Sequence, residues 1–206
     1  MLALTNSGGL TAPRMLHVDD GAASATSIKW GWLGTLPLSS ETVLFLRNIA
    51  LDTDRDDEDL EPRHLMFHKC SLDEAPATKL LSRFAHLETL VLFETEVDNF
   101  MQTLLALPTT IRHVHSLQQD VDLNTYSFGA SVVLPRLESF TFTWLLPPTD
   151  SGPQMLADDD LGALEDLRRG VESLFDAPQC TFKFLRSDRS PGDALADALA
   201  ALKLDM

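Results

Sequence analysis

Two segments, Leu87-Glu88-Thr89-Leu90-Val91-Leu92 and Leu137-Glu138-Ser139-Phe140-Thr141-Phe142, carry one pattern, with apolar residues at the first, fourth and sixth positions. Because successive side chains of a strand point to opposite faces, the apolar-x-apolar ending predicts a strand with one buried face. Five further triplets of this kind, one of them degenerate, occur in the chain: Leu16-His17-Val18, Leu44-Phe45-Leu46, Leu65-Met66-Phe67, Val114-His115-Ser116 and Phe182-Lys183-Phe184. The sequence therefore predicts seven strands.

The triplets are spaced almost regularly. Their first residues are 28, 21, 25, 24, 26 and 42 residues apart, and most of these intervals match the repeat length of about 20 to 29 residues in leucine-rich repeats. We therefore predict an α/β fold, a leucine-rich-repeat-like solenoid with a single row of short parallel strands and with helices and loops on the convex side. One array of about seven irregular repeats would fill residues 1-206, with strands near 14-19, 42-47, 63-68, 87-93, 111-116, 137-143 and 180-185.

Helices are expected between the strands, where apolar residues recur at three- and four-residue steps. The long sixth interval carries such a pattern from Leu161 to Phe175. A last helix is predicted over 191-204, with Ser190 as its N-cap and Pro191 in its first turn. We expect this helix to cap the open end of the array.

Pro-Arg dipeptides are a second recurrent feature. Pro13-Arg14, Pro62-Arg63 and Pro135-Arg136 each precede an expected strand. Proline is tolerated at the first position of a strand, so we expect these dipeptides at strand entrances.

A different α/β architecture is the alternative. A small enzyme or ligand-binding domain with a two-sided parallel sheet would also contain apolar triplets, and its pocket would lie at the carboxyl ends of the central strands. Strands covered on both faces are nearly continuously apolar, whereas these strands mostly alternate. Helices on both faces of the sheet would favour this alternative.

Composition and charge restrict the kind of partner. The chain has 206 residues and a formal net charge of -15, and such a negative field repels phosphate backbones and anionic lipid surfaces. We therefore expect a protein partner of basic or neutral character, no nucleic acid and no membrane. Two cysteines, Cys70 and Cys180, provide neither a disulfide framework nor a zinc ligand set, and no stretch resembles a signal peptide. The expected location is cytoplasmic or nuclear.

The degenerate L-x-x-L-x-L segments, the Pro-Arg entrances and the phenylalanine replacements resemble the C-terminal repeat region of fungal F-box proteins. The resemblance extends over about Leu16 to Phe184 and rests on no single diagnostic motif. It implies a substrate-recognition surface of an F-box-type ubiquitin-ligase receptor. The F-box itself, which docks the ligase adaptor, has no counterpart because the first expected strand begins near Leu16.

The expected concave face carries the candidate binding residues. If the apolar anchors point inward, the residues that alternate with them point outward, and five of the six histidines are among those residues. The candidates are His17, Phe45, Arg47, His64, Met66, His68, Val91, Phe93, His113 and His115. Such a surface suits protein recognition, and its histidines would respond to pH near 6 to 7. Alternatively, these side chains are merely tolerated on strands, and a loop or neighbouring side chains cover the apolar ones.

Other motifs fail on their details. The acidic run 52-59 begins like a calcium loop, but Asp57 stands where glycine is needed and Arg63 where a glutamate belongs. His64, His68 and Cys70 lie too far apart along one strand to share a metal. No nucleophile motif or phosphate-binding loop occurs. We therefore expect no enzyme activity, no cofactor and no metal.

Overall fold

The computed structural model describes strands 2–6, 15–20, 26–29, 43–47 and 49–52, and the segments 61–70, 81–94, 104–119, 132–145 and 158–201. Side chains are described in 43–47, 61–70, 81–94, 104–119, 132–145, 162 and 164–200. The structural statements below concern these residues.

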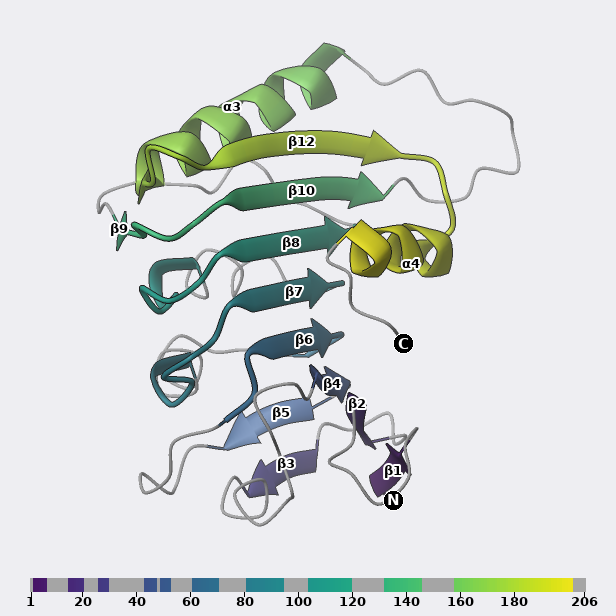
Figure 1. Cartoon of the computed structure of the whole chain (residues 1–206). Coiled ribbons are helices and arrows are strands. Elements are labelled where there is room, and N and C mark those ends of the chain that lie inside the picture. The colour runs from purple at the N-terminus through teal and green to yellow at the C-terminus, as the bar shows by residue number, and fades with distance from the viewer. Residues whose placement is uncertain are drawn as a thin grey trace.

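An eight-stranded sheet forms the centre of the molecule (Figure 1). Its strands follow one another in chain order: β1 (Leu2–Asn6), β2 (Met15–Asp20), β4 (Val43–Arg47), β6 (His64–His68), β7 (Thr89–Phe93), β8 (His113–Gln118), β10 (Ser139–Leu145) and β12 (Thr181–Ser187). All neighbours pair in parallel except β1, which pairs antiparallel with β2. The predicted α/β class with a parallel sheet is confirmed, and each expected strand range overlaps one strand from β2 to β12.

The strands pair in a register that aligns the apolar anchors. Leu44, Leu65, Leu90, Val114, Phe140 and Phe182 form one row across the sheet, and Leu46, Phe67, Leu92, Ser116, Phe142 and Phe184 form the next. Both rows point to the side of helix α3 (Asp158–Leu174), whose Leu167, Val171 and Leu174 lie in the same hydrophobic cluster. We call this side the α3 face.

Polar atoms inside this core are paired. Cys70, two residues beyond β6, donates its thiol hydrogen to the carbonyl oxygen of Leu46, with an Sγ to O distance of 3.3 Å. Ser116 replaces an apolar anchor, and its hydroxyl oxygen accepts a hydrogen bond from the buried Gln118 at 3.0 Å. Pairing removes the cost of burying these groups unsatisfied.

Four strands of the main sheet are entered through the same turn. Before β7, β8, β10 and β12 an amide hydrogen is donated three residues back: Leu87 to Phe84, Ile111 to Pro108, Leu137 to Leu134 and Cys180 to Ala177. The prediction that Pro-Arg stands at strand entrances is right for Pro62 and Arg63, which directly precede β6. Pro135 and Arg136 also stand at an entrance, but they lie within the turn that leads into β10 and do not directly precede the strand. Pro13 and Arg14 lie outside the described residues.

Charged side chains alternate at the strand entrances. Arg63 lies 3.4 Å from Glu88, Glu88 lies 3.6 Å from Arg112, and Arg112 lies 2.6 Å from Glu138. These side chains are 29 to 51% exposed, so each pair contributes at most about 1 kcal/mol. These ion pairs therefore add little to the stability of the strand register and do not determine it.

Two small parallel sheets lie on the return segments and were not predicted. β3 (Thr26–Lys29) pairs with β5 (Ile49–Asp52), and β9 (Val132–Val133) pairs with β11 (Phe175–Asp176). Their shortness explains the omission, because two to four residues carry no readable alternation.

Helix α4 (Pro191–Ala201) lies within the predicted range 191-204, but it packs at a different place in the fold from the one expected. Its first turn is capped as expected: the Ser190 hydroxyl accepts a hydrogen bond from the Asp193 amide at 3.2 Å. It does not cap the end of the row beyond β12, however. Instead, α4 lies beside the carboxyl end of β8 on the sheet side opposite α3 (Figure 1), and its Ala194 and Leu199 share a hydrophobic cluster with residues of β6, β7 and β8. We call this side the α4 face.

We predict that Phe140→Ala lowers the free energy of unfolding by about 3 to 5 kcal/mol, measured by urea denaturation. Phe140 is fully buried, and its ring centroid lies 5.7 to 6.0 Å from the rings of Phe175, Phe182 and Phe184. Leu185→Ala is the control, because Leu185 is 48% exposed. Equal losses from the two changes would contradict the assignment of the core to the α3 face.

Candidate interaction surface

The candidate binding residues lie together on the α4 face, in three rows set by the strand register. The rows read Val43, His64, Thr89, His113, Ser139, Thr181; then Phe45, Met66, Val91, His115, Thr141, Lys183; then Arg47, His68, Phe93, Leu117, Thr143, Leu185. His17, on β2, pairs in register with Phe45 of β4, but the side chain of His17 is not among the described ones. The alternation of residues thus placed these positions on one face.

The middle of this face is a second hydrophobic core and not an open surface. Met66 and Val91 are 1% exposed and Phe93 is 4% exposed, because they cluster with Ala194 and Leu199 of α4. Phe45 packs against the same cluster. The interpretation of Met66, Val91 and Phe93 as exposed binding residues is therefore wrong, since all three are buried in this cluster.

The apolar stripe of α4 is the signal that could have revealed this burial. Ala194, Leu195, Ala198 and Leu199 recur at helical spacing and all pack on the second cluster. An apolar helix stripe needs an apolar partner surface, and on this face of β12 a single apolar residue, Leu185, stands beside the exposed Thr181 and Lys183. The apolar members of the rows on β6, β7 and β8 provide such a surface.

His68 lies at the carboxyl end of β6, stacked between two phenyl rings. Its ring centroid is 4.4 Å from that of Phe93 and 6.1 Å from that of Phe45. Its Nε2 lies 3.1 Å from Oε2 of Glu94, which also pairs with Nζ of Lys69 at 3.2 Å. Burial lowers the pKa of His68 although its hydrogen bond to the carboxylate of Glu94 acts in the opposite direction.

The backbone beside this pair adopts an uncommon conformation. Lys69 and Glu94 directly follow β6 and β7, and their φ angles are 52° and 48°. Their amides donate to the carbonyl oxygens of Phe93 and Leu117, and these bonds hold non-glycine residues in the left-handed region. Sequence reasoning missed Lys69 and Glu94, because neither residue type announces a positive φ.

The burial of the His68 and Glu94 pair suits a structural role better than a catalytic one. Both side chains are only 12% exposed, and the imidazole is covered on both faces by phenyl rings. A general base must come within hydrogen-bonding reach of its substrate. This geometry leaves the pair a positioning role at the junction of β6 and β7.

The other described histidines of the face differ in their surroundings. His113 is 30% exposed, and its Nδ1 lies 3.0 Å from the hydroxyl of Ser139. Burial lowers the pKa of His113 and lowers that of His115, which is 8% exposed, to about 4. His64 and Arg47 are half-buried. The expected response near pH 6 to 7 is thus wrong for His115, whose burial moves its titration well below that range.

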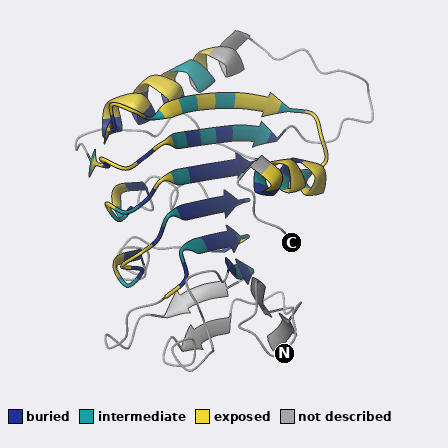
Figure 2. Ribbon diagram, viewed as in Figure 1, coloured by how far each residue is buried: buried dark blue, intermediate teal, exposed yellow. Residues whose placement is uncertain are grey.

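The part of the face formed by β10 and β12 is open. Thr181, Lys183 and Leu185 are exposed on β12, and Thr141 and Thr143 are half-buried on β10. Figure 2 shows the change from dark blue on β7 and β8 to mostly yellow and teal on β12. We call Ser139, Thr141, Thr143, Thr181, Lys183 and Leu185 the open patch.

Neither metal binding nor thiol chemistry is evident in the described residues. No group of three histidines, cysteines or carboxylates lies close enough there to hold a metal ion. Of the set His64, His68 and Cys70, His68 binds Glu94 and Cys70 faces the opposite core. Burial raises the pKa of the Cys180 thiol to about 11, so it stays protonated and weakly nucleophilic at neutral pH.

Comparison with known proteins shows no relative: no family model, no curated protein and no solved structure matches the chain. Among the described residues, no helix has both the length and the apolar character needed to cross a membrane.

We predict that the free energy of unfolding falls by about 2 kcal/mol from pH 7.5 to pH 5 on account of His115 alone. An unfolded histidine binds a proton near pH 6.5, whereas His115 in the fold does so only near pH 4. Its contribution is therefore complete above pH 6.5 and decreases as the pH falls from 6.5 toward 4.

His115→Asn removes the titrating group. Urea denaturation at the two pH values should therefore show that the free energy of unfolding of this variant falls by about 2 kcal/mol less than that of the wild type. His86→Asn is the matched control, because His86 is exposed. An equal pH dependence in wild type and His115→Asn would contradict the burial of a neutral imidazole.

Proposed function

We propose that the chain is a protein-interaction module with a leucine-rich-repeat-like solenoid fold, and that its partner binds the open patch. Four features support the solenoid: sequential parallel strands, an unshifted register, small parallel sheets on the return segments, and the hydrogen bond of Cys70 to the preceding strand. The cysteine follows Leu65 and Phe67 at the spacing where leucine-rich repeats carry asparagine or cysteine.

The observation that carries the function is the contrast between the two parts of the α4 face. On β6, β7 and β8 the face is buried in a cluster that includes Ala194 and Leu199 of α4, whereas on β10 and β12 it presents threonines, a lysine and a leucine to solvent. The site is thus smaller than the sequence predicted. Of the candidate residues, His113 and His115 border the open patch. Met66, Val91 and Phe93 lie outside it, buried in the cluster that includes Ala194 and Leu199.

The substrate-recognition role of an F-box-type ubiquitin-ligase receptor fits the same surface. That role rests on the resemblance of the repeat segments to fungal F-box proteins. It adds one requirement, which is that the bound protein has a longer half-life in cells that lack this chain. A pulse-chase measurement on the identified partner tests that requirement.

A ligand-binding α/β domain is the second candidate, because α3 and α4 lie on opposite faces of the sheet. Helices on both faces are the arrangement that favours it. Its pocket would lie at the carboxyl ends of the central strands, where His68, Phe93 and Glu94 pack together. Because these side chains already occupy the expected pocket position, the packing favours the interaction module over the ligand-binding domain.

We predict that a photo-cross-linking residue at Thr141 captures a protein partner and that the same residue at Gly162 does not. Thr141 lies in the centre of the open patch, whereas Gly162 lies on α3, where an added Cβ meets no atom within 4 Å. Irradiation in an extract of the source cells, followed by mass spectrometry, gives the readout. Capture from Gly162 but not from Thr141 would place the interaction on the α3 side of the molecule and would contradict the proposal.

A further inference from the structure

The α4 face differs in charge from the rest of the chain. The chain carries 31 acidic and 16 basic residues. In the described strands β4 to β12, no aspartate or glutamate occupies any of the positions in the three rows. Arg47, Lys183 and four histidines do, so the strand positions of this face lack carboxylates in a strongly acidic molecule. The described carboxylates on this side include Asp193 and Asp197 of α4.

Carboxylates around the strand rows have partners of their own. On α4, Asp197 pairs with Arg189, and Asp193 accepts a hydrogen bond from the Ser190 hydroxyl. Glu94, beyond the end of β7, is held by His68 and Lys69. Glu138, before β10, is held by Arg112. None of these carboxylates neutralises Lys183 in the open patch.

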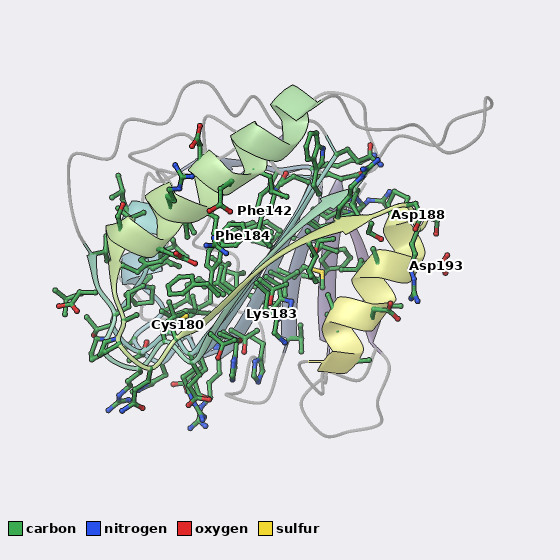
Figure 3. The ribbon with its side chains drawn as sticks, turned by 90° about the horizontal axis from the view of Figure 1, so that it is seen from above. Phe142, Cys180, Lys183, Phe184, Asp188 and Asp193 are labelled. Atoms are coloured by element: carbon green, nitrogen blue, oxygen red, sulfur yellow. The ribbon has the colours of Figure 1, made fainter. Side chains whose placement is uncertain are left out.

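Lys183 is the exposed cation of the open patch. Figure 3 shows it on the α4 side of β12, opposite Phe142 and Phe184. It stands in register with Thr141, and no carboxylate of the described residues forms an ion pair with it. An ammonium group flanked by hydroxyl donors is suited to a carboxylate.

We propose that the open patch binds an acidic peptide segment of the protein partner, with Lys183 as the charged anchor and Thr141, Thr143 and Thr181 as hydrogen-bond donors. This inference rests on the proposed interaction function and specifies its ligand. It reverses the expectation of a basic or neutral partner, because that expectation used the net charge, and binding at short range depends on the local charge.

His113 makes this binding depend on pH. His113 faces Arg112, Glu88 and Glu138, and His115 faces His113 and Lys183. Both are uncharged at neutral pH, because burial lowers their pKa values. His115 stays uncharged down to a pH of about 4, whereas His113 is 30% exposed. A bound carboxylate favours the protonated imidazole of His113 and raises its pKa, so the affinity rises as the pH falls from 7.5 to 5.5.

The test uses a fluorescein-labelled peptide of eight glutamates and fluorescence anisotropy. We expect the full chain to bind it, and to bind at least about threefold more tightly at pH 5.5 than at pH 7.5, because His113 gains a proton. Lys183→Glu should weaken binding about tenfold or more.

The matched control is Arg136→Glu, which changes the net charge equally. Arg136 is exposed in the turn before β10, so we expect its variant to bind within about twofold of wild type. Equal losses in the two variants, or tighter binding of a peptide of eight lysines, would overturn the proposal.

Competition separates this inference from the proposed function. If the glutamate peptide suppresses cross-linking from Thr141, the inference is supported. If cross-linking from Thr141 persists at saturating peptide, the patch binds a partner by other chemistry and the acidic ligand is wrong. If Thr141 captures no partner, the interaction function itself is wrong.

Discussion

The unshifted register of parallel strands is the constraint on which the rest of this structure depends. Because β4 to β12 pair without offset, each anchor residue lies beside its counterpart, and the rows from Leu44 to Phe182 stack into one core. A shift of one residue would move every anchor to the other face. The same register aligns the rows on the α4 face, so the core and the open patch are two results of one pairing pattern.

Much of this could be predicted from the sequence, because the alternation of apolar and polar residues is a local signal. The triplet Leu90-Val91-Leu92 identifies a strand and shows that Val91 points away from its neighbours. It cannot show what covers Val91. Val91 is buried in one cluster with Leu199, which lies 108 residues later in the chain (199 minus 91).

The same limit explains the errors on the histidines. The pattern placed His68 and His115 on one face, but their burial depends on Phe45, Phe93 and α4, which meet only in the folded chain. The left-handed backbone at Lys69 and Glu94 was likewise hidden, because no glycine marks either position. By contrast, the N-cap at Ser190 was found, since a capping residue acts on amides three residues away.

The position of α4 sets the order in which the molecule can assemble. Neighbouring strands from β4 to β10 are close in sequence, so each can pair as soon as its predecessor is in place. Leu199 and Met66 share a cluster across 133 residues (199 minus 66), so α4 can dock only after β6, β7 and β8 have paired. A nascent chain released before Pro191 would leave Met66, Val91 and Phe93 uncovered, and a chaperone that binds exposed apolar surface would distinguish it from the finished fold.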